Sequence, residues 1–394
     1  MNFFELAKQE QAYMVALRRH FHRHPEVSLQ EFETAGRIEA ELDALQIPHV
    51  RVGQTGVAAT LQGRGEGAAA VVLRADIDAL PMQDQKEVSY CSANAGAMHA
   101  CGHDAHTAAL LGAARLLAQN RESFGGQVRL FFQQGEEIGE GARLFVKQGL
   151  LKGARRVFGL HVTPLLSSGK VAIRAGATNA SVDYFKITVQ GKAAHVSTPQ
   201  KGADALYIAT QIVNALQGIA TRRVSPVDDI VIGVGTLHAG TSYNIVAGEA
   251  VLEGTTRAFV QQTREEVNAA IEKTAHSLAA LYGAAAAVEW KEFTPALINH
   301  QTASDEAAKL AVEAIGQGNV VTDMPRSLGG DNFADFLQQV PGVYAYLGTA
   351  SPKVAGSAEP LHSTGFDLDE SVLWLAAGLH AQFAWQTLAN GQSF

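Results

Sequence analysis

The sequence predicts an α/β fold: a larger domain built on a mostly parallel sheet, with an inserted α+β domain. Three observations support this prediction. Apolar runs alternate with helical stretches in the first and last parts of the chain. The middle part instead follows the order β-α-β-β-α-β of the ferredoxin-like arrangement. The 394 residues also exceed the roughly 250 to 300 at which one core stops growing, so two domains are expected.

The larger domain begins with two predicted helices. Apolar residues at helical spacing place them at residues 4–20 and 29–45, with a break at the His-Pro pair, residues 24–25. Helical spacing returns at residues 106–119. Apolar runs predict strands at 68–76, 127–134, 156–162 and 342–348. Such strands, alternating with helices, indicate a mostly parallel sheet covered on both faces.

The inserted domain is expected at residues 178–291. Its strands are SVDYFKITVQG, DIVIGVGTLHAG, EAVLEGTTRAF and AAAAVEWKEF, and its helices are ADALYIATQIVNALQGI and TREEVNAAIEKTAHSLAALYG. Residues 1–177 and 292–394 are therefore assigned to the α/β domain.

Composition and charge exclude several classes of protein. With 47% hydrophobic and 18% charged residues the chain has ordinary globular composition. The net charge of −8 removes the general attraction to nucleic acid and anionic membranes, so neither is an expected partner. No apolar run is long enough for a membrane span, and the amphipathic start has no leader pattern, so we expect a cytoplasmic protein. Cys91 and Cys101 should then be reduced.

Side chains that bind metals gather where the predicted strands end, which is where open α/β sheets bind ligands. The stretch MHACGHDAH, residues 98–106, adds Cys101 and His103 just before a predicted helix, whose positive end favours a thiolate. The strand ends supply Asp76, Asp78, Glu136, Glu137, His161 and His362.

Each of these residues has a simpler explanation: a strand-end aspartate caps turns, a Glu-Glu pair is solvated, and a single histidine packs in a core. Several segments converge, however. In extended chain Cys101 and His103 point the same way, whereas Glu136 and Glu137 point to opposite sides, so one glutamate could bind metal and the other take a proton. The set exceeds the three protein ligands of a mononuclear catalytic zinc, which favours two metal ions.

The motifs together carry a family resemblance. They are LRRHFHRHPEVSLQEFET, RADIDALP, MHACGHDAHT, the Glu-Glu pair, GLHV, GKAAHVSTP, SYNIVAGEAVLEGTTRAF and EPLHSTGFDLDE, in that order. In this order they resemble the dinuclear amidohydrolases of metallopeptidase family 20, in the branch of hippurate hydrolase, indole-acetyl-amino-acid hydrolases and N-acetyl-diaminopimelate deacetylase. The resemblance covers nearly the whole chain. It implies a dinuclear-metal catalytic α/β domain and an inserted lid that also dimerises.

The resemblance implies a role for each matching residue. Cys101 becomes the ligand that bridges two metal ions. The remaining ligands are His103 and Glu137 for one ion and His161 and His362 for the other. The ions are expected to be zinc or manganese, while cobalt and nickel also suit these donors.

Glu136 becomes the general base. Asp78 is the second catalytic residue, and Asp76 and Asp78 are both expected to orient the metal ligands. The third catalytic residue is His195. Taken alone it would be a loop histidine, but its counterpart in the family reaches a neighbouring protomer's site and hydrogen-bonds the reacting carbonyl. His99, Asp104 and His106 are expected to be supporting or purely structural residues.

Asn244 and Arg257 resemble binders of the substrate carboxylate, although an arginine at a strand end is otherwise most often a surface residue. The chain departs from its relatives at Asn179, where an apolar residue is common, at Val196, and at SLGGDNF, residues 327–333. Asn179 is expected to bind substrate and to favour a more polar acyl or amino-acid group.

The expected function is a metal-dependent hydrolase that cleaves N-acyl-L-amino acids into a carboxylic acid and an amino acid. A homodimer or homotetramer is expected to form through the lid. One alternative is a dipeptidase or carboxypeptidase with the same two metals. Another is a non-catalytic binding subunit, against which the presence of Glu136 argues, because a binder needs no base beside a metal.

Overall fold

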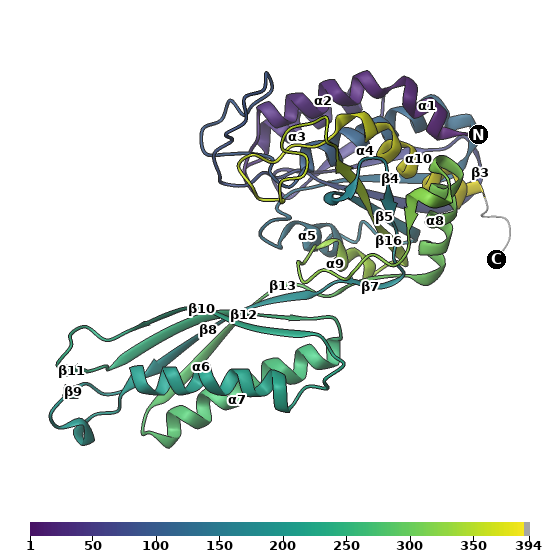
Figure 1. The fold of residues 1–394 in the computed structure, drawn as a ribbon. Helices are drawn as coiled ribbons and strands as arrows, with labels where there is room; N and C mark the ends of the chain where they lie inside the picture. Colours follow the sequence, from purple (N-terminus) through teal and green to yellow (C-terminus); the bar gives the residue numbers. More distant parts are fainter. Residues whose placement is uncertain (390–394) are drawn as a thin grey trace. The chain divides into compact units, whose positions relative to one another are not determined.

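The computed structural model describes residues 1–389. The chain divides into two compact units (Figure 1). Unit 1 comprises Met1–Gly176, Ile298–Pro325 and the residues from Asn332 onward, and unit 2 comprises Ala177–Leu297 and Arg326–Asp331. The last five residues of the predicted α/β domain, 390–394, lie outside the described part.

Unit 1 contains an eight-stranded sheet in the order β1-β2-β4-β3-β5-β16-β6-β15. The neighbours β4, β3, β5 and β16 at its centre are parallel, which confirms the predicted α/β fold with a large, mostly parallel sheet. Continuous apolar runs form these central strands because both faces of the sheet are covered. The strands are β1 (His49–Val52), β2 (Gly56–Gln62), β3 (Gly65–Asp76), β4 (Gly125–Gln133), β5 (Ala154–Ser167), β6 (Val171–Ala172), β15 (Val320–Val321) and β16 (Gly342–Ala350).

Helices cover both faces of this sheet. Figure 1 shows α1, α2, α4 and α10 on one face and α5 and α9 on the other. Helix α4 is buried on almost every side, which explains its largely apolar sequence. The helices are α1 (Phe3–Gln9), α2 (Gln11–Arg23), α3 (Phe32–Ala44), α4 (His103–Gln119), α5 (Gly141–Lys147), α8 (Gln301–Ile315), α9 (Phe333–Leu337) and α10 (Leu373–Ala389).

Two predicted helix boundaries are wrong. The expected helix at 4–20 is two helices, because Glu10 has ψ 7° and ends α1 before α2 begins. The expected helix at 29–45 begins only at Phe32, since Leu29 lies in the left-handed region with φ 63°.

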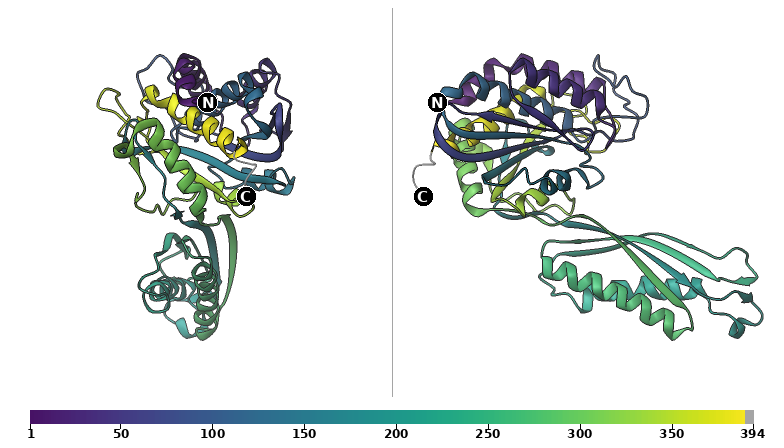
Figure 2. Two further views of the ribbon diagram at one scale, coloured as in Figure 1. Left: turned by 90° about the vertical axis from the view of Figure 1, so that its right-hand side faces the viewer. Right: turned by 180° about the vertical axis from the view of Figure 1, so that it is seen from behind.

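Unit 2 follows the order β8-α6-β10-β12-α7-β13, and its antiparallel sheet has the strand order β10-β12-β8-β13. Figure 2 shows both helices on one face of this sheet, where they enclose a second hydrophobic core. The strands are β8 (Ser181–Gln190), β10 (Ile230–Ala239), β12 (Glu249–Ala258) and β13 (Ala285–Thr294), and the helices are α6 (Ala205–Arg222) and α7 (Gln261–Leu281).

Two short ladders complete the strands. One pairs β9 (Ala194–His195) with β11 (Ile245–Val246), and the other pairs β7 (Gly176–Asn179) with β14 (Leu297–Asn299). Among residues 1–389, no helix combines the length and apolar character needed to cross a membrane.

Candidate metal centre

The parallel strands of unit 1 deliver the candidate ligands to one edge of the sheet. Asp76 is the last residue of β3, and Glu136 follows the end of β4. His161 lies in β5, and His362 lies in the loop after β16. Because these four strands are parallel neighbours, their carboxyl ends meet at the same edge.

Cys101 and His103 reach the site through a left-handed glycine rather than through extended chain. Gly102 has φ 86°, and helix α4 begins directly at His103. A Cβ at Gly102 would lie 2.3 Å from Cγ2 of Val162, so only glycine fits here without a shift. The expected extended geometry was therefore wrong, although the two side chains do converge.

The two glutamates also lie in a turn. The N–H of Gly139 donates to the carbonyl oxygen of Glu136 at 2.8 Å, which closes the turn. Both carboxylates lie near the His103 imidazole, with ligand atoms within 4.8 Å of one another. The prediction that they point to opposite sides was wrong, because it assumed extended chain.

The structure brings all five predicted ligands together. The Sγ atom of Cys101 lies 3.4 Å from Nε2 of His161. The Oε1 atom of Glu137 lies 3.4 Å from Nε2 of His362 and 3.9 Å from Nε2 of His103. Cys101 belongs both to a cluster with His103 and His161 and to one with Glu137 and His362. The expected division of the other four ligands, His103 with Glu137 and His161 with His362, is therefore wrong, because the fold sets the two histidines of the α4 start and β5 together. A thiolate at the junction of two clusters has the position that a bridging ligand needs.

The tautomers of two histidines leave the correct nitrogen for a metal. Nδ1 of His103 donates to the carbonyl oxygen of Asp78 at 2.9 Å, and Nδ1 of His161 donates to that of Val162 at 2.6 Å. Such a bond from the second ring nitrogen orients metal-binding histidines in many sites. Nε2 of His161 then keeps its lone pair. Despite burial, Asp76 and Cys101 raise the pKa of His103 well above its usual value, so Nε2 of His103 offers its lone pair once a metal has displaced that proton.

Buried atoms with unused bonding capacity show that these residues fit a cation. In the described part of the chain, Nε2 of His103 and Oε1 of Glu137 are buried and have no hydrogen-bond partner. They face each other across 3.9 Å, a distance too long for a hydrogen bond. Metal ions bound at this cluster would use both atoms, which otherwise remain unsatisfied at an energetic cost.

Asp76 and His106 support the ligands. Nε2 of His106 accepts the N–H of Val162 at 2.9 Å, so its proton lies on Nδ1, which donates to Asp76 at 2.5 Å. His106 is near enough to Asp76 and His103 to hold an ion with them, but its Nε2 lone pair is already used. Instead His106 fixes β5 at Val162, next to the ligand His161.

Asp78 holds the second glutamate as well as His103. Its Oδ2 accepts the N–H of Glu137 at 3.0 Å and the hydroxyl of Ser28 at 2.7 Å. Asp78 therefore holds Glu137 through its carboxylate and His103 through its backbone carbonyl group, which supports the predicted orienting role.

Two polar residues of the site were not foreseen. Arg74 donates to Asp76 at 2.7 Å and to the side chain of Asn332 at 3.0 Å. The N–H of Asn332 donates to Glu136 at 3.3 Å. Arg74 lies two residues before Asp76 on the same face of β3, a spacing that could have indicated it. Asn332 lies in SLGGDNF, a stretch that the sequence singled out only as a departure from the relatives and not as part of this edge.

The electrostatics of the site favour a bound cation. Burial raises the pKa of the Cys101 thiol well above its usual value, and the Glu137 carboxylate adds to this effect. Burial also lowers the pKa of His161, so its imidazole is neutral. Despite burial, Arg74 and the neighbouring histidines lower the pKa of Asp76. A metal must therefore displace the thiol proton, after which its charge stabilises the thiolate.

Unit 2 holds the predicted substrate-binding residues at two separate places. His195 in β9 pairs with Ile245 of β11, next to Asn244. Arg257, near the end of β12, donates to the carbonyl oxygen of Leu328 at 3.4 Å, and Asn179 is buried and bridges to Ser327. One chain therefore does not bring Asn244 and Arg257 together.

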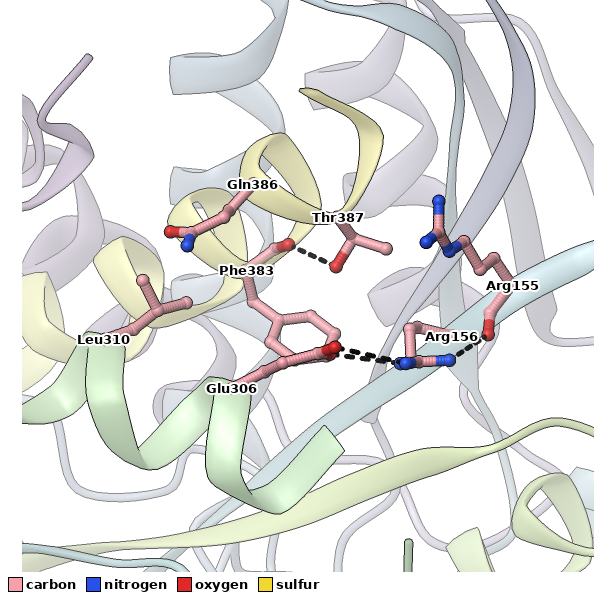
Figure 3. Close-up of a pocket in the computed structure, with 7 residues that line it drawn as sticks. All are labelled: Arg155, Arg156, Glu306, Leu310, Phe383, Gln386 and Thr387. Carbon is pink, nitrogen blue, oxygen red and sulfur yellow. Dashed lines mark hydrogen bonds and ion pairs between the residues drawn. The ribbon is translucent and has the colours of Figure 1, made fainter. Parts of the chain in front are cut away.

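Figure 3 shows a surface pocket of unit 1 that is separate from this cluster. Arg156 donates two bonds to the Glu306 carboxylate there, at 3.1 Å each, and a third to the carbonyl oxygen of Arg155 at 3.1 Å. The lining residues are Arg155, Arg156, Glu306, Leu310, Phe383, Gln386 and Thr387. None of them is a predicted site residue.

An α/β sheet that gathers thiolate, imidazole and carboxylate groups at its carboxyl edge defines the class of metal-dependent hydrolases. The family model for peptidase family M20/M25/M40 matches residues 72–386, and the chain belongs to this family. Its relatives place it in the amidohydrolase branch.

Three similar proteins illustrate the comparison. The N-acetylcysteine deacetylase of Bacillus subtilis is 36% identical over 94% of this chain and 96% of its own length. Thermostable carboxypeptidase 2 of Saccharolobus solfataricus is 37% identical over 96% of each chain. The crystal structure of the Bacillus subtilis YxeP protein, a dinuclear metal-binding peptidase of the M20 family, has a TM-score of 0.84 at 35% identity and covers 97% of this chain and 99% of its own.

Proposed function

We propose that this enzyme hydrolyses the amide bond of N-acyl-L-amino acids and releases a carboxylic acid and a free amino acid. The observation that carries this proposal is the cluster of Glu136, Glu137 and His103, whose ligand atoms lie within 4.8 Å of one another. It sets a carboxylate that can move a proton beside one that can bind a metal. A relative at 36% identity is named for the removal of an acetyl group from N-acetylcysteine.

Two divalent ions would be held by the five converging residues, with Cys101 shared between them. The other ligands would be His103 and His161 for one ion, and Glu137 and His362 for the other, as the two clusters group them. When bound, the ions would lower the pKa of a water molecule and polarise the amide carbonyl. Zinc and manganese suit this mixture of thiolate, imidazole and carboxylate best, and cobalt and nickel also fit.

Glu136 would move the proton. Its Oε1 atom accepts the N–H of Asn332, which orients the carboxylate. Glu136 takes a proton from the attacking water and passes it to the leaving nitrogen, so that the amine departs neutral. Asp78 keeps the Glu137 backbone and the His103 ring in place during these transfers.

Unit 2 would act as the lid and supply the remaining contacts. Arg257 pairs with Val182 at the start of β8, whereas β9 follows the end of β8 at Gln190. Eight residues of extended chain separate Val182 from Gln190, which corresponds to roughly 26 Å. One chain therefore cannot place both His195 and Arg257 on a single small substrate.

This separation supports an assembly in which the two ends of the lid serve different active sites. Arg257 would bind the substrate carboxylate in its own subunit, with Asn179 beside it. His195 and Asn244 would reach the active site of a second subunit, where His195 donates to the reacting carbonyl. A homodimer or homotetramer formed through the lid meets this requirement. The cytoplasmic location stays a prediction.

A dipeptidase or carboxypeptidase is the second candidate, because a relative at 37% identity is named a carboxypeptidase. It differs from the first in its substrate: a dipeptidase requires a free α-amino group, whereas an N-acyl amino acid has none. A non-catalytic binding subunit would need neither Glu136 nor its orienting contact with Asn332.

The test measures the release of free amino acid from N-acetyl, N-benzoyl, N-phenylacetyl and N-indole-acetyl amino acids and from free dipeptides, with manganese or zinc added. The variants are Glu136→Gln and, as a control in the same loop, Glu140→Gln at an exposed position. We expect turnover that only Glu136→Gln abolishes, with the metal content unchanged. No turnover of any substrate by the fully metallated protein would refute the hydrolase function.

A further inference from the structure

The loop that carries His195 is closed by its own backbone. The strand β9 ends at His195, and the N–H of Thr198 returns to the carbonyl oxygen of His195 at 2.8 Å. The N–H of Val196 donates to the carbonyl oxygen of Asn244 at 3.1 Å, which ties the turn to β11. The His195 side chain is exposed, yet its backbone has defined partners on both sides.

Ser197 determines which ring nitrogen of His195 carries the proton. The backbone N–H of Ser197 donates to Nδ1 of His195 at 3.1 Å, and the Ser197 hydroxyl lies 2.7 Å from the same nitrogen. A backbone amide can only donate, so at 3.1 Å it favours Nδ1 as the acceptor, and the shorter hydroxyl contact strengthens this preference. The neutral imidazole therefore carries its proton on Nε2.

The histidines at the metal centre show the opposite arrangement. Nδ1 of His103 and Nδ1 of His161 face carbonyl oxygens, to which they can only donate, so Nε2 is the nitrogen left for a metal in each ring. Nδ1 of His195 faces an N–H and leaves Nε2 as a donor. The local backbone thus sets a metal-binding tautomer in unit 1 and a hydrogen-donating tautomer in unit 2.

We propose that Ser197 is a positioning residue that holds His195 in the Nε2–H tautomer, with this N–H presented to the carbonyl oxygen of the substrate. The donor half of this inference rests on the proposed function, in which His195 contacts the reacting carbonyl. In that role a fixed donor stabilises negative charge that develops on the oxygen, whereas the other tautomer would present a lone pair to it.

Nuclear magnetic resonance tests the tautomer without reference to activity. The full-length protein is labelled with ¹⁵N-histidine, and long-range ¹H–¹⁵N correlations are recorded at about pH 8, where an ordinary imidazole is neutral. The spectrum of His195→Gln identifies the His195 signals among those of the 14 histidines.

We expect the Nε2–H pattern in the native protein and in Ser197→Thr, which keeps a hydroxyl. Ser197→Ala keeps the amide N–H but loses the hydroxyl, so its signals should move toward a mixture of tautomers. A native Nδ1–H pattern, or a Ser197→Ala spectrum identical to the native one, would overturn the role of Ser197.

Turnover tests the donor role with a pair of isosteric variants. Glutamine places an amide N–H near the position of Nε2, whereas asparagine reaches only the position of Nδ1. His195→Asn should lower kcat about 100-fold to 1,000-fold, as the loss of an oxyanion donor does. His195→Gln should retain at least about ten times the kcat of the asparagine variant, since it keeps a donor there.

Ser197→Ala should lower kcat about five-fold, the effect of one ordinary hydrogen bond, with KM unchanged, and Ser197→Thr should restore it. Equal losses in the glutamine and asparagine variants would overturn the donor role. An inactive native protein would refute the proposed function and this donor role with it, while the spectrum still decides whether Ser197 sets the tautomer.

Discussion

Gly102→Ala tests whether the site depends on the left-handed glycine between two ligands. Gly102 has φ 86° and ψ 14° and joins Cys101 to His103. Holding a residue with a Cβ in this conformation costs about 1 to 2 kcal/mol. The new methyl would also lie 2.3 Å from Cγ2 of Val162, and such overpacking costs about 1 to 3 kcal/mol. The free energy of unfolding should therefore fall by about 2 to 5 kcal/mol.

A matched control separates the two contributions. Gly149 has φ 70°, and a Cβ there would have no atom within 4 Å, so Gly149→Ala should cost only the conformational 1 to 2 kcal/mol or so. Adding Val162→Ala to Gly102→Ala removes the steric conflict. The double-mutant cycle should therefore show a favourable coupling of about 1 to 3 kcal/mol.

The assay is urea unfolding of the metal-free proteins, followed by competition of the folded proteins with a coloured chelator for zinc. Because Gly102 separates two ligands, its substitution should weaken metal binding about 10-fold to 100-fold, whereas Gly149→Ala should not change it. Equal stability losses in both variants, or no rescue by Val162→Ala, would refute the steric argument.

Three further predictions concern buried charge, acid sensitivity and metal. Arg18→Met should cost about 3 to 5 kcal/mol in urea because it removes the guanidinium that pairs with the buried Asp104 and Asp367, whereas the half-exposed Arg19→Met should cost under about 1 kcal/mol; similar losses would contradict this. Burial lowers the pKa of His380 from 6.5 to about 3, so the unfolded chain binds more protons than the folded protein between these values. The free energy of unfolding therefore decreases as the pH is lowered below about 6.5. At pH 5 this loss is about 2 kcal/mol, and His380→Leu should lack it when unfolding at pH 5 and pH 7.5 is compared; equal losses in both proteins would count against it. Restoring metal to about 100 times its Kd should stabilise the metal-free protein by about 2.7 kcal/mol in thermal melts, and clearly less in Cys101→Ala; an equal gain would exclude Cys101 as a ligand.

The positions of the central strands along the chain could be predicted because buried parallel strands are nearly continuous apolar runs. The run at 68–76 corresponds to β3, and only the exposed residues of Gly65–Asp76 fell outside it. Helix boundaries were harder. The apolar spacing continues through Glu10, but α1 packs against α10 while α2 packs against α4, so the chain bends between two partners that the local sequence does not show.

The site residues could be predicted by type but not by geometry. Their identities followed from the chemistry of thiolate, imidazole and carboxylate, whereas the assumption of extended chain was wrong at both close pairs. At the first pair the glycine adopts φ 86° without any side-chain cap to announce the start of α4. At the second pair the turn closed by Gly139 brings both carboxylates to His103.

Contacts distant in sequence explain what the motifs could not show. His362 has φ 64°, unusual for a residue with a Cβ, and its N–H donates to the carbonyl oxygen of Ala100 at 2.8 Å. This bond joins two ligand loops that are more than 250 residues apart in the chain. A left-handed histidine persists only where the surrounding structure holds it, so its strain is offset by the contacts of the fold. The motif EPLHSTGF therefore indicates that a histidine lies at the site, while the angle from which it approaches depends on the loop before α4.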